Sequence, residues 1–215
     1  MKKVYLFGRG KMAASVMDEA KKQSISVEKT LEKNVPAIHF GKKDTLVHDA
    51  LLCVKKGAPL LIGTTGWEKE APCIKTAFEN SGVAALYAPN CSLGVSYFMH
   101  IAKLAFSLLE KDSTFLPTLY DHHHEQKVDA PSGTAKKIAQ DYKQITGQTL
   151  PIFSSRAGFH PGTHQIVFDS PYETLFLRHE SRNRNVYAQG ALLMAKWLEG
   201  KQGFFTMDDF FTRNT

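Results

Sequence analysis

The stretch from Asp121 to Thr134 combines three consecutive histidines with a lysine and the start of a helix; it reads Asp-His-His-His-Glu-Gln-Lys-Val-Asp-Ala-Pro-Ser-Gly-Thr. Histidine is the side chain best suited to proton transfer near neutral pH. Lys127 adds a positive charge that can stabilise a developing anion or a substrate carboxylate. This combination predicts a site that moves protons on a small anionic substrate.

The end of the same stretch predicts an anion-binding helix start. A helix is expected from Ser132 to Gly147, with Ser132 as its N-cap. The unpaired backbone amides of the first turn, the helix dipole and the hydroxyl of Thr134 together favour a bound carboxylate. Proton transfer and carboxylate capture are therefore predicted side by side.

Consecutive histidines are also candidate metal ligands. On an extended segment, however, His122, His123 and His124 alternate between two faces, and no H-x-H or C-x-x-C set accompanies them. We expect no metal site. A metal-dependent hydrolytic enzyme that uses these histidines remains an alternative, which inhibition by a chelator would favour.

A glycine-rich turn near the N-terminus predicts dinucleotide binding. Residues 8–13, Gly-Arg-Gly-Lys-Met-Ala, have the form G-x-G-x-x-A between a predicted strand at 4–7 and a predicted helix at 11–22. Such glycines let the backbone approach a pyrophosphate, which then lies at the helix N-terminus. An ordinary glycine turn is the alternative.

Charged residues around this turn bear on the choice of cofactor. Glu32, near the end of a strand predicted at 25–31, is placed to hold the adenosine ribose. Arg9, Lys11 and Lys33 add positive charge that suits the 2′-phosphate of NADPH. They are equally compatible with a solvated surface, so both NADPH and NADH stay open.

Two further motifs follow predicted strands at 60–62 and 83–87. They are Gly63-Thr64-Thr65-Gly66 and Ala88-Pro89-Asn90-Cys91. The carboxyl ends of parallel strands are where open α/β sheets bind ligands, so these residues are candidates to contact the nicotinamide and its ribose. Simple strand-to-helix turns are the alternative. Cys91 has no neighbouring histidine base, which makes it a bystander.

The order of elements predicts the fold class. Through residue 91 strands alternate with helices, which is typical of a doubly wound parallel sheet, and we expect a Rossmann-like α/β domain. After Asn90 come a long apolar helix (93–110), a strand (115–120), the helix at 132–147 and two β-like runs (163–168 and 173–179). We expect residues 1–91 and 185–215 to form the dinucleotide-binding domain. Residues 92–184 should form an inserted α+β domain for substrate binding and oligomerisation.

Composition excludes several classes of protein. The net charge of +6 arises largely from lysine pairs scattered along the chain, which do not form a nucleic-acid-binding stripe. No apolar run approaches the roughly 18 residues that a membrane helix needs, so we expect no membrane contact and a cytoplasmic location. In a reducing compartment Cys53 and Cys73 are expected to be buried thiols.

The residues from His123 to Ala135 resemble the signature H-H-x-x-K-x-D-A-P-S-G-T-A of the 4-hydroxy-tetrahydrodipicolinate reductase family. The similarity covers most of the chain. Its other parts are Gly63–Gly66, Ala88–Asn90, His179, Arg184, Tyr187–Ala191 and Trp197-Leu198.

The resemblance implies that NADPH or NADH reduces a small cyclic dicarboxylate imine, converting 4-hydroxy-tetrahydrodipicolinate to tetrahydrodipicolinate in diaminopimelate and lysine biosynthesis. His123 matches the proton donor and acceptor, Lys127 the second proton donor and His124 a substrate contact. Gly133 and Thr134 match the pair that binds a substrate carboxylate. The expected cofactor-binding residues are Gly8, Gly10, Lys11, Met12, Glu32, Lys33, Gly63, Thr64, Thr65, Ala88, Pro89, Asn90 and Cys91.

A nucleotide-sensing protein without catalysis is the alternative of a different class. His123 and Lys127 argue against it, because a sensor needs no proton donor. The chain also departs from the family pattern: Ala13 replaces a glycine, Asp121 stands where glutamate is usual, and Cys91 where phenylalanine is usual. The chain is shortened after Leu31 and within 157–180. In the family the second of these regions builds a sheet for tetramer contacts, and we expect a homo-oligomer.

Overall fold

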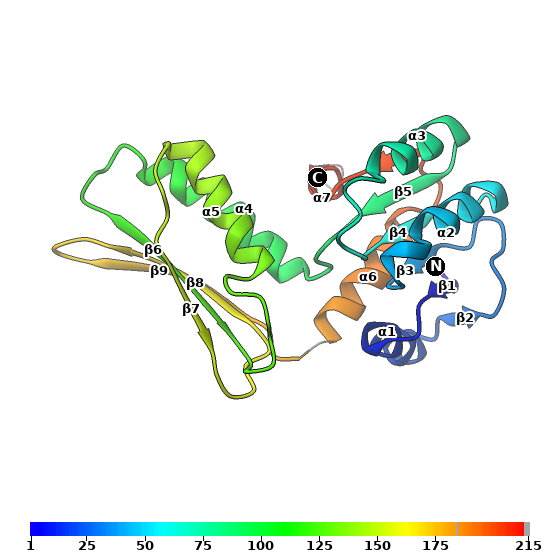
Figure 1. Ribbon diagram of the computed structural model, residues 1–215, viewed down its shortest axis with the longest axis horizontal. Helices are drawn as coiled ribbons and strands as arrows, with labels where there is room; N and C mark the ends of the chain where they lie inside the picture. Colours follow the sequence, from blue (N-terminus) through cyan, green and yellow to red (C-terminus); the bar gives the residue numbers. More distant parts are fainter. Residues whose placement is uncertain (184, 213–215) are drawn as a thin grey trace. The chain divides into compact units, whose positions relative to one another are not determined.

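The chain folds into two compact units (Figure 1). The computed structural model describes residues 1–183 and 185–212. Unit 1 comprises Met1–Ser92 and the described residues that follow Asn183, and unit 2 comprises Leu93–Asn183.

Unit 1 is built on a six-stranded parallel sheet with the strand order β10-β5-β4-β3-β1-β2. Its strands are β1 (Lys3–Phe7), β2 (Ser26–Glu28), β3 (Ala37–His39), β4 (Leu60–Ile62), β5 (Ala84–Tyr87) and β10 (Gly203–Phe205). Its helices are α1 (Lys11–Lys22), α2 (Lys43–Lys56), α3 (Ala71–Ser81), α6 (Asn185–Trp197) and α7 (Met207–Thr212). Helices α1 and α6 pack together as one layer and α2 and α3 as another (Figure 1). The predicted Rossmann-like, doubly wound fold is confirmed.

The central strands of unit 1 are buried on both faces. Every residue of β3 and β4 is buried, as expected for short apolar strands covered by helices on either side. Helix α2 contributes Leu46, Ala50 and Cys53 to this core and ends at Gly57, whose left-handed conformation forms the C-cap. The carboxyl ends of the strands are thereby held at one edge of a rigid sheet.

Unit 2 is a four-stranded mixed sheet with the order β7-β6-β8-β9, covered on one face by two helices. Its elements are α4 (Leu93–Leu109), β6 (Leu116–His123), α5 (Gly133–Thr146), β7 (Ile152–Arg156), β8 (Thr163–Asp169) and β9 (Thr174–Glu180). Strand β6 pairs parallel with β7 and antiparallel with β8. Phe98 and Phe106 of α4 and Ile138 of α5 pack against Leu119 and Ile166 of the sheet. The expected α+β character is confirmed.

Several elements differ from the sequence-based expectation. Strand β6 runs to His123, so Asp121 and His123 lie on a strand. Strand β7 was not predicted, because Ile-Phe-Ser-Ser-Arg lacks an apolar alternation, and β10 and α7 were also missed. Strand β2 is only three residues long and ends at Glu28.

The two cysteines of α2 and α3 differ in burial. Cys53 is buried as expected, but Cys73 is exposed, because it lies on the outward face of α3. Within residues 1–183 and 185–212, no helix is long and apolar enough to cross a membrane.

Candidate active site

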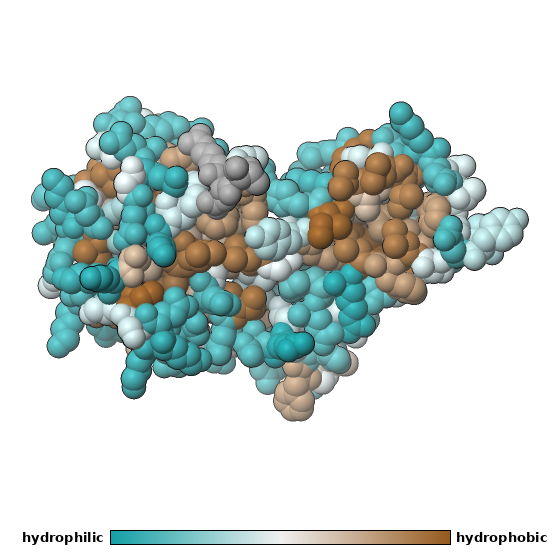
Figure 2. Space-filling model, turned by 180° about the vertical axis from the view of Figure 1, so that it is seen from behind, coloured by the Kyte–Doolittle hydropathy of each residue, from teal (hydrophilic) through white to brown (hydrophobic). Residues whose placement is uncertain are grey.

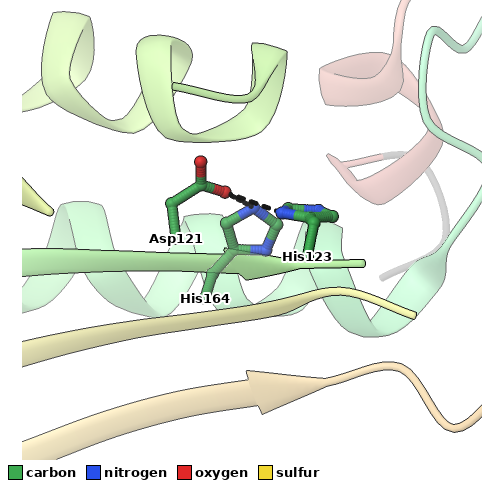
Figure 3. Close-up of side chains that lie close together, drawn as sticks. All are labelled: Asp121, His123 and His164. Carbon is green, nitrogen blue, oxygen red and sulfur yellow. Dashed lines mark ion pairs between the residues drawn. The ribbon is translucent and has the colours of Figure 1, made fainter. Parts of the chain in front are cut away.

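The alternation of side chains along β6 selects which of the three histidines enters the interior of unit 2. Asp121 and His123 point toward the helix-covered face and are buried, whereas His122 points to the opposite face. His164 of β8 pairs with Asp121 in register and reaches the same interior. Figure 3 shows the three side chains Asp121, His123 and His164 meeting within unit 2.

One oxygen of the Asp121 carboxylate faces two imidazoles. Its Oδ1 atom lies 3.1 Å from Nδ1 of His123 and 3.3 Å from Nε2 of His164. The angles do not meet hydrogen-bond geometry, and Oδ1 and the His123 Nδ1 have no other partner in the described residues. The two rings are in edge contact, with centroids 5.3 Å apart.

The other oxygen of Asp121 accepts three hydrogen bonds. Its Oδ2 atom accepts from the Ser132 amide at 2.9 Å, the Ser154 hydroxyl at 3.2 Å and the Arg156 guanidinium at 2.9 Å. Burial by itself would raise the pKa of Asp121. The contacts with His123, His164, the Ser132 amide and Arg156 outweigh burial and hold this pKa well below its usual range. Asp121 is therefore a buried, ionised carboxylate.

The N-terminus of α5 is anchored to this carboxylate through Ser132. Ser132 is the N-cap, as predicted, and its hydroxyl accepts from the Ala135 amide at 3.2 Å. The same hydroxyl lies 3.1 Å from Nε2 of His164. Gly133 is exposed, and a Cβ atom added there would meet nothing within 4 Å. The space in front of the first turn is open to a ligand.

Lys127 and His124 lie in the loop between β6 and α5. Lys127 Nζ is 2.6 Å from Oδ1 of Asp129, and this contact lowers the pKa of Asp129. Its backbone amide donates to the His124 carbonyl at 3.1 Å. Arg156 donates from Nε to the Asp129 carbonyl at 3.1 Å, so the same guanidinium holds the loop and the buried carboxylate.

Gly162, in the loop before β8, borders the outer nitrogen of His123. A Cβ atom at Gly162 would lie 3.1 Å from His123 Nε2, and its φ of +150° is one that other residues rarely adopt. The glycine thus leaves Nε2 accessible.

A metal ion is the alternative reading of the buried cluster. Asp121, His123 and His164 offer ligand atoms within 4.8 Å of one another. Arg156, however, places a positive charge 2.9 Å from the same carboxylate, where it would repel a bound cation. Hydrogen bonds already use the Oδ2 atom. The absence of a metal stays a prediction.

The candidate cofactor residues of unit 1 gather at the carboxyl edge of its sheet. Backbone hydrogen bonds join the strand ends: Phe40 donates to Phe7, Gly63 to His39 and Ala88 to Ile62, at 3.0, 3.0 and 2.9 Å. Gly8 has a φ of +109°, and a Cβ atom there would lie 2.6 Å from the Phe40 carbonyl oxygen. The turns that hold Gly8, Gly10, Lys11 and Met12, Gly63 to Thr65, and Ala88 to Cys91 therefore follow three strands of one sheet edge.

Thr64 has an internal role in this edge. Its hydroxyl lies 2.7 Å from Nδ1 of His39 and 3.2 Å from the carbonyl oxygens of His39 and Gly41. His39 Nε2 is 3.1 Å from Asp49, yet burial dominates and lowers the pKa of His39. His39 was missed by the sequence analysis, although a histidine inside a short apolar strand is a usable signal.

The turn after β5 also uses its side chains internally. The Asn90 side-chain oxygen accepts from the Ser92 amide at 2.9 Å, which shapes the turn before α4. The Cys91 thiol is buried 3.6 Å from the Ala88 carbonyl, and burial raises its pKa to about 12. Cys91 is thus a protonated, unreactive thiol, and any cofactor contact here would come from the backbone.

Glu32 and Lys33 do not lie with the other candidates. Glu32 contacts Lys3 at the start of β1, at 3.3 Å, and Lys33 lies beside Gly57, just before β4. Both are at the amino edge of the sheet, because the chain turns back after the short strand β2. The carboxyl end of β2 carries Glu28 and Lys29 instead. The sequence signal for these two residues is the charged pair Glu28-Lys29 itself, which marks the end of the strand predicted at 25–31.

The fold and the sheet edge define the class of the chain. A doubly wound sheet with a glycine turn after its first strand, joined to a second α+β unit, is the architecture of Rossmann-like nucleotide-binding proteins. A family model described as dihydrodipicolinate reductase, C-terminus, matches residues 94–211. The chain belongs to the dihydrodipicolinate reductase family.

Individual relatives agree with this assignment. The chain is 33% identical to a 4-hydroxy-tetrahydrodipicolinate reductase of Methanoregula boonei, over 82% of this chain and 78% of that protein. It is 26% identical to one of Christiangramia forsetii, over 96% of both chains. A dipicolinate-bound dihydrodipicolinate reductase from a Paenisporosarcina species has the same fold, with a TM-score of 0.80, 20% identity and coverage of 97% of this chain and 99% of that one.

Proposed function

We propose that this protein reduces 4-hydroxy-tetrahydrodipicolinate to tetrahydrodipicolinate with NADPH or NADH, as an oxidoreductase of diaminopimelate and lysine biosynthesis. The observation that carries the proposal is the placement of His123 beside an open helix N-terminus, both tied to the Asp121 carboxylate. The relatives from Methanoregula boonei and Christiangramia forsetii bear the name of this activity.

The N-terminus of α5 would hold a carboxylate of the substrate. The Gly133 and Thr134 amides lie in the first helical turn, where backbone donors lack partners within the helix. Because no atom lies within 4 Å of a Cβ placed on Gly133, a carboxylate can approach the amides directly. The Thr134 hydroxyl would add a further hydrogen bond.

His123 would supply the proton and Lys127 the charge. The bound cofactor would supply the hydride. The 4-hydroxyl group of the substrate would leave as water, and hydride addition to the resulting conjugated imine would leave negative charge on the conjugated system. His123 then donates a proton from Nε2, the nitrogen that Gly162 leaves accessible. Lys127 stabilises the developing anion and is the second proton donor, while Asp129 keeps its side chain in the loop. His124 contacts the substrate from the same loop.

Unit 1 would hold the cofactor. The residues present fit a dinucleotide: Gly10 is the N-cap of α1 and uses no side chain, so the first-turn amides are available to a pyrophosphate. Arg9 and Lys11 are exposed beside it. Gly8, Gly10, Lys11 and Met12 would contact the pyrophosphate, and the turns at 63–65 and 88–91 the nicotinamide half. We therefore assign residues 1–91 and 185–215 to dinucleotide binding and 92–184 to the substrate.

Self-association of the protein would use the apolar surface of unit 2. Phe153 and Phe176 are exposed on the face of the sheet away from α4 and α5, where Phe153 stacks on Tyr120 with centroids 5.6 Å apart. A second apolar area of unit 2 lies on α4, where Ile101, Leu104 and Leu108 are exposed; Figure 2, with unit 2 on the right, shows apolar side chains gathered on the helix-bearing part of this unit. Patches of this kind mark interfaces. We propose a cytoplasmic homo-oligomer, a tetramer by resemblance; light scattering that finds only monomer at micromolar concentration would refute it.

The function is tested by mixing purified protein with enzymatically generated substrate and either NADPH or NADH. We expect consumption of the reduced cofactor, seen as a loss of its absorbance, that depends on both protein and substrate. No turnover with either cofactor would exclude the reductase. Cofactor binding without consumption would favour a nucleotide sensor.

A further inference from the structure

We propose that Asp121 is the positioning residue of this site: it selects the tautomer of His123 that carries its proton on Nδ1, and it fixes the N-terminus of α5 relative to that ring. The selected tautomer leaves Nε2 free to take up a second proton from solvent. The doubly protonated ring then donates this proton from Nε2 to the substrate and returns to the tautomer that is protonated on Nδ1. Its catalytic consequence rests on the proposed function, whereas the tautomer itself does not.

The hydrogen bonds of the Asp121 carboxylate leave one of its oxygens for the histidines. The Oδ2 atom already accepts from Ser132, Ser154 and Arg156, so Oδ1 is the oxygen left to face the histidines. His123 Nδ1 lies 3.1 Å from Oδ1 and has no hydrogen-bond partner in the described residues. An unprotonated Nδ1 would set two lone pairs against each other at this distance. A proton on Nδ1 turns the same contact into an attraction.

The opposite nitrogen has the surroundings of a reacting atom. A Cβ atom added at Gly162 would lie 3.1 Å from His123 Nε2, so a side chain at this position would crowd that nitrogen. The positive φ of Gly162 also disfavours any residue with a side chain. The fold therefore fills the Nδ1 side of the ring with a carboxylate and leaves room on the Nε2 side.

The groups around His123 include no second carboxylate in the described residues that could replace Asp121 as the partner of Nδ1. Arg156 of β7 and His164 of β8 approach from the neighbouring strands, and His179 of β9 interacts with His164. From α4 the uncharged ring of Phe98 contacts both His164 and His179. In the described residues, Asp121 is the one carboxylate within 4 Å of His123 or His164. Without it, Arg156 would face the imidazoles as an unbalanced cation.

The same carboxylate links the proton donor to the anion-binding turn. Ser132 donates its amide to Oδ2, and the next two residues, Gly133 and Thr134, are the proposed carboxylate site. Arg156 bridges Asp121 and the Asp129 carbonyl, which steadies the loop before α5. A substitution of Asp121 should therefore alter both the proton donor, His123, and the proposed carboxylate site at the N-terminus of α5.

The first test uses the wild-type protein and needs no turnover. Long-range proton–nitrogen correlation spectra of the nitrogen-15-labelled full chain distinguish the two neutral imidazole tautomers. The His123 signals are assigned by their loss in His123→Gln. We expect neutral His123 to be protonated at Nδ1; protonation at Nε2 would overturn the proposal.

The second test removes the charge with Asp121→Asn and keeps the shape of the side chain. We expect the His123 tautomer to change and kcat to fall about 100-fold, within the range of about 10²–10⁴ that a general acid contributes. KM for NADPH should stay within about twofold, because the cofactor residues lie in unit 1. Asp121→Glu should restore the tautomer and at least about tenfold of the lost rate.

The matched control is Asp141→Asn. Asp141 is also a buried aspartate of unit 2, paired with Lys137 at 2.7 Å and Lys103 at 3.5 Å, but it lies outside the site. This variant should leave both tautomer and kcat unchanged. If Asp121→Asn behaves the same way, the positioning role is refuted. If the wild type shows the Nδ1 tautomer but turns over no substrate, the positioning geometry stands and the reductase function fails.

Discussion

The two candidate binding regions use different chemical groups: mainly backbone groups in unit 1 and mainly side chains in unit 2. At the carboxyl edge of the unit 1 sheet, the proposed cofactor contacts are glycines and backbone amides, while the polar side chains of Thr64 and Asn90 bond within their own loops. In unit 2, the side chains themselves form the site, and one buried carboxylate connects residues from three strands and a helix start. A backbone site tolerates changes of side chain that a side-chain network does not. Substitutions should therefore affect catalysis more in unit 2 than in unit 1.

The largest effect is expected for His123→Gln. Glutamine keeps a polar side chain at the position but cannot donate a proton in the same way, so kcat should fall by about 10³-fold. KM for the substrate should change little, because a general acid acts mainly in the transition state. Steady-state kinetics of NADPH consumption measure both constants.

His122→Gln is the matched control, since His122 is the adjacent histidine on the opposite face of β6. Its rate should stay within about twofold of wild type, as expected for a substitution away from the site. Equal losses in the two variants would contradict the assignment of His123.

The sequence predicts the turns of unit 1 and the start of α5 better than it predicts the side-chain cluster around Asp121. The glycine turn, the strand–helix alternation and the start of α5 are local patterns, because the residues that form each feature are neighbours in the chain. His164 and Arg156 reach Asp121 through the pairing of β6 with β8 and β7, and register is not encoded in either segment alone. Glu32 was misplaced for a related reason: β2 pairs over only three residues, and the chain returns to the amino edge before Glu32.

A second prediction concerns the N-terminus of α5, where the proposed substrate contacts in unit 2 are backbone amides. Gly133→Val should raise KM for the substrate about tenfold or more, because the branched side chain would occupy the space in front of the α5 amides. Folding should be preserved, since an added Cβ meets no atom within 4 Å. Thermal unfolding checks the fold and initial rates give KM.

Gly133→Ala supplies an intermediate step in side-chain size, and its KM should lie between the other two. A valine variant with the wild-type KM would remove α5 from the substrate site. A gradual rise would support capture of the carboxylate by backbone donors.

A third prediction uses acid to test the buried carboxylate. The pKa of Asp121 is lower in the folded protein than in the unfolded chain, so the unfolded chain takes up the proton first as the pH falls. The stabilisation is complete above the ordinary aspartate pKa of about 3.9 and is lost at about 1.4 kcal/mol per pH unit below it. Urea unfolding of wild type and Asp121→Asn should therefore converge as the pH drops below about 4. A constant difference between pH 7 and pH 3 would show that ionisation of Asp121 contributes nothing.

The smallest effect is expected for Thr64→Val, which tests whether Thr64 stabilises the fold of unit 1 or contacts the cofactor. Thr64→Val removes a hydroxyl that lies 2.7 Å from the buried His39 and should lower the free energy of unfolding by about 1 kcal/mol. Because that hydroxyl faces the fold, KM for NADPH should change less than about threefold.

Thr65 is the informative partner, since it is the exposed neighbour in the same turn. Thr65→Val should leave stability within about 0.5 kcal/mol, so any change in its KM for NADPH reports contact with the cofactor. A tenfold rise in KM for Thr64→Val at unchanged stability would reverse the roles of the two threonines. In that case the edge of unit 1 would depend on side chains as the Asp121 cluster does, and the contrast between the two regions would fail.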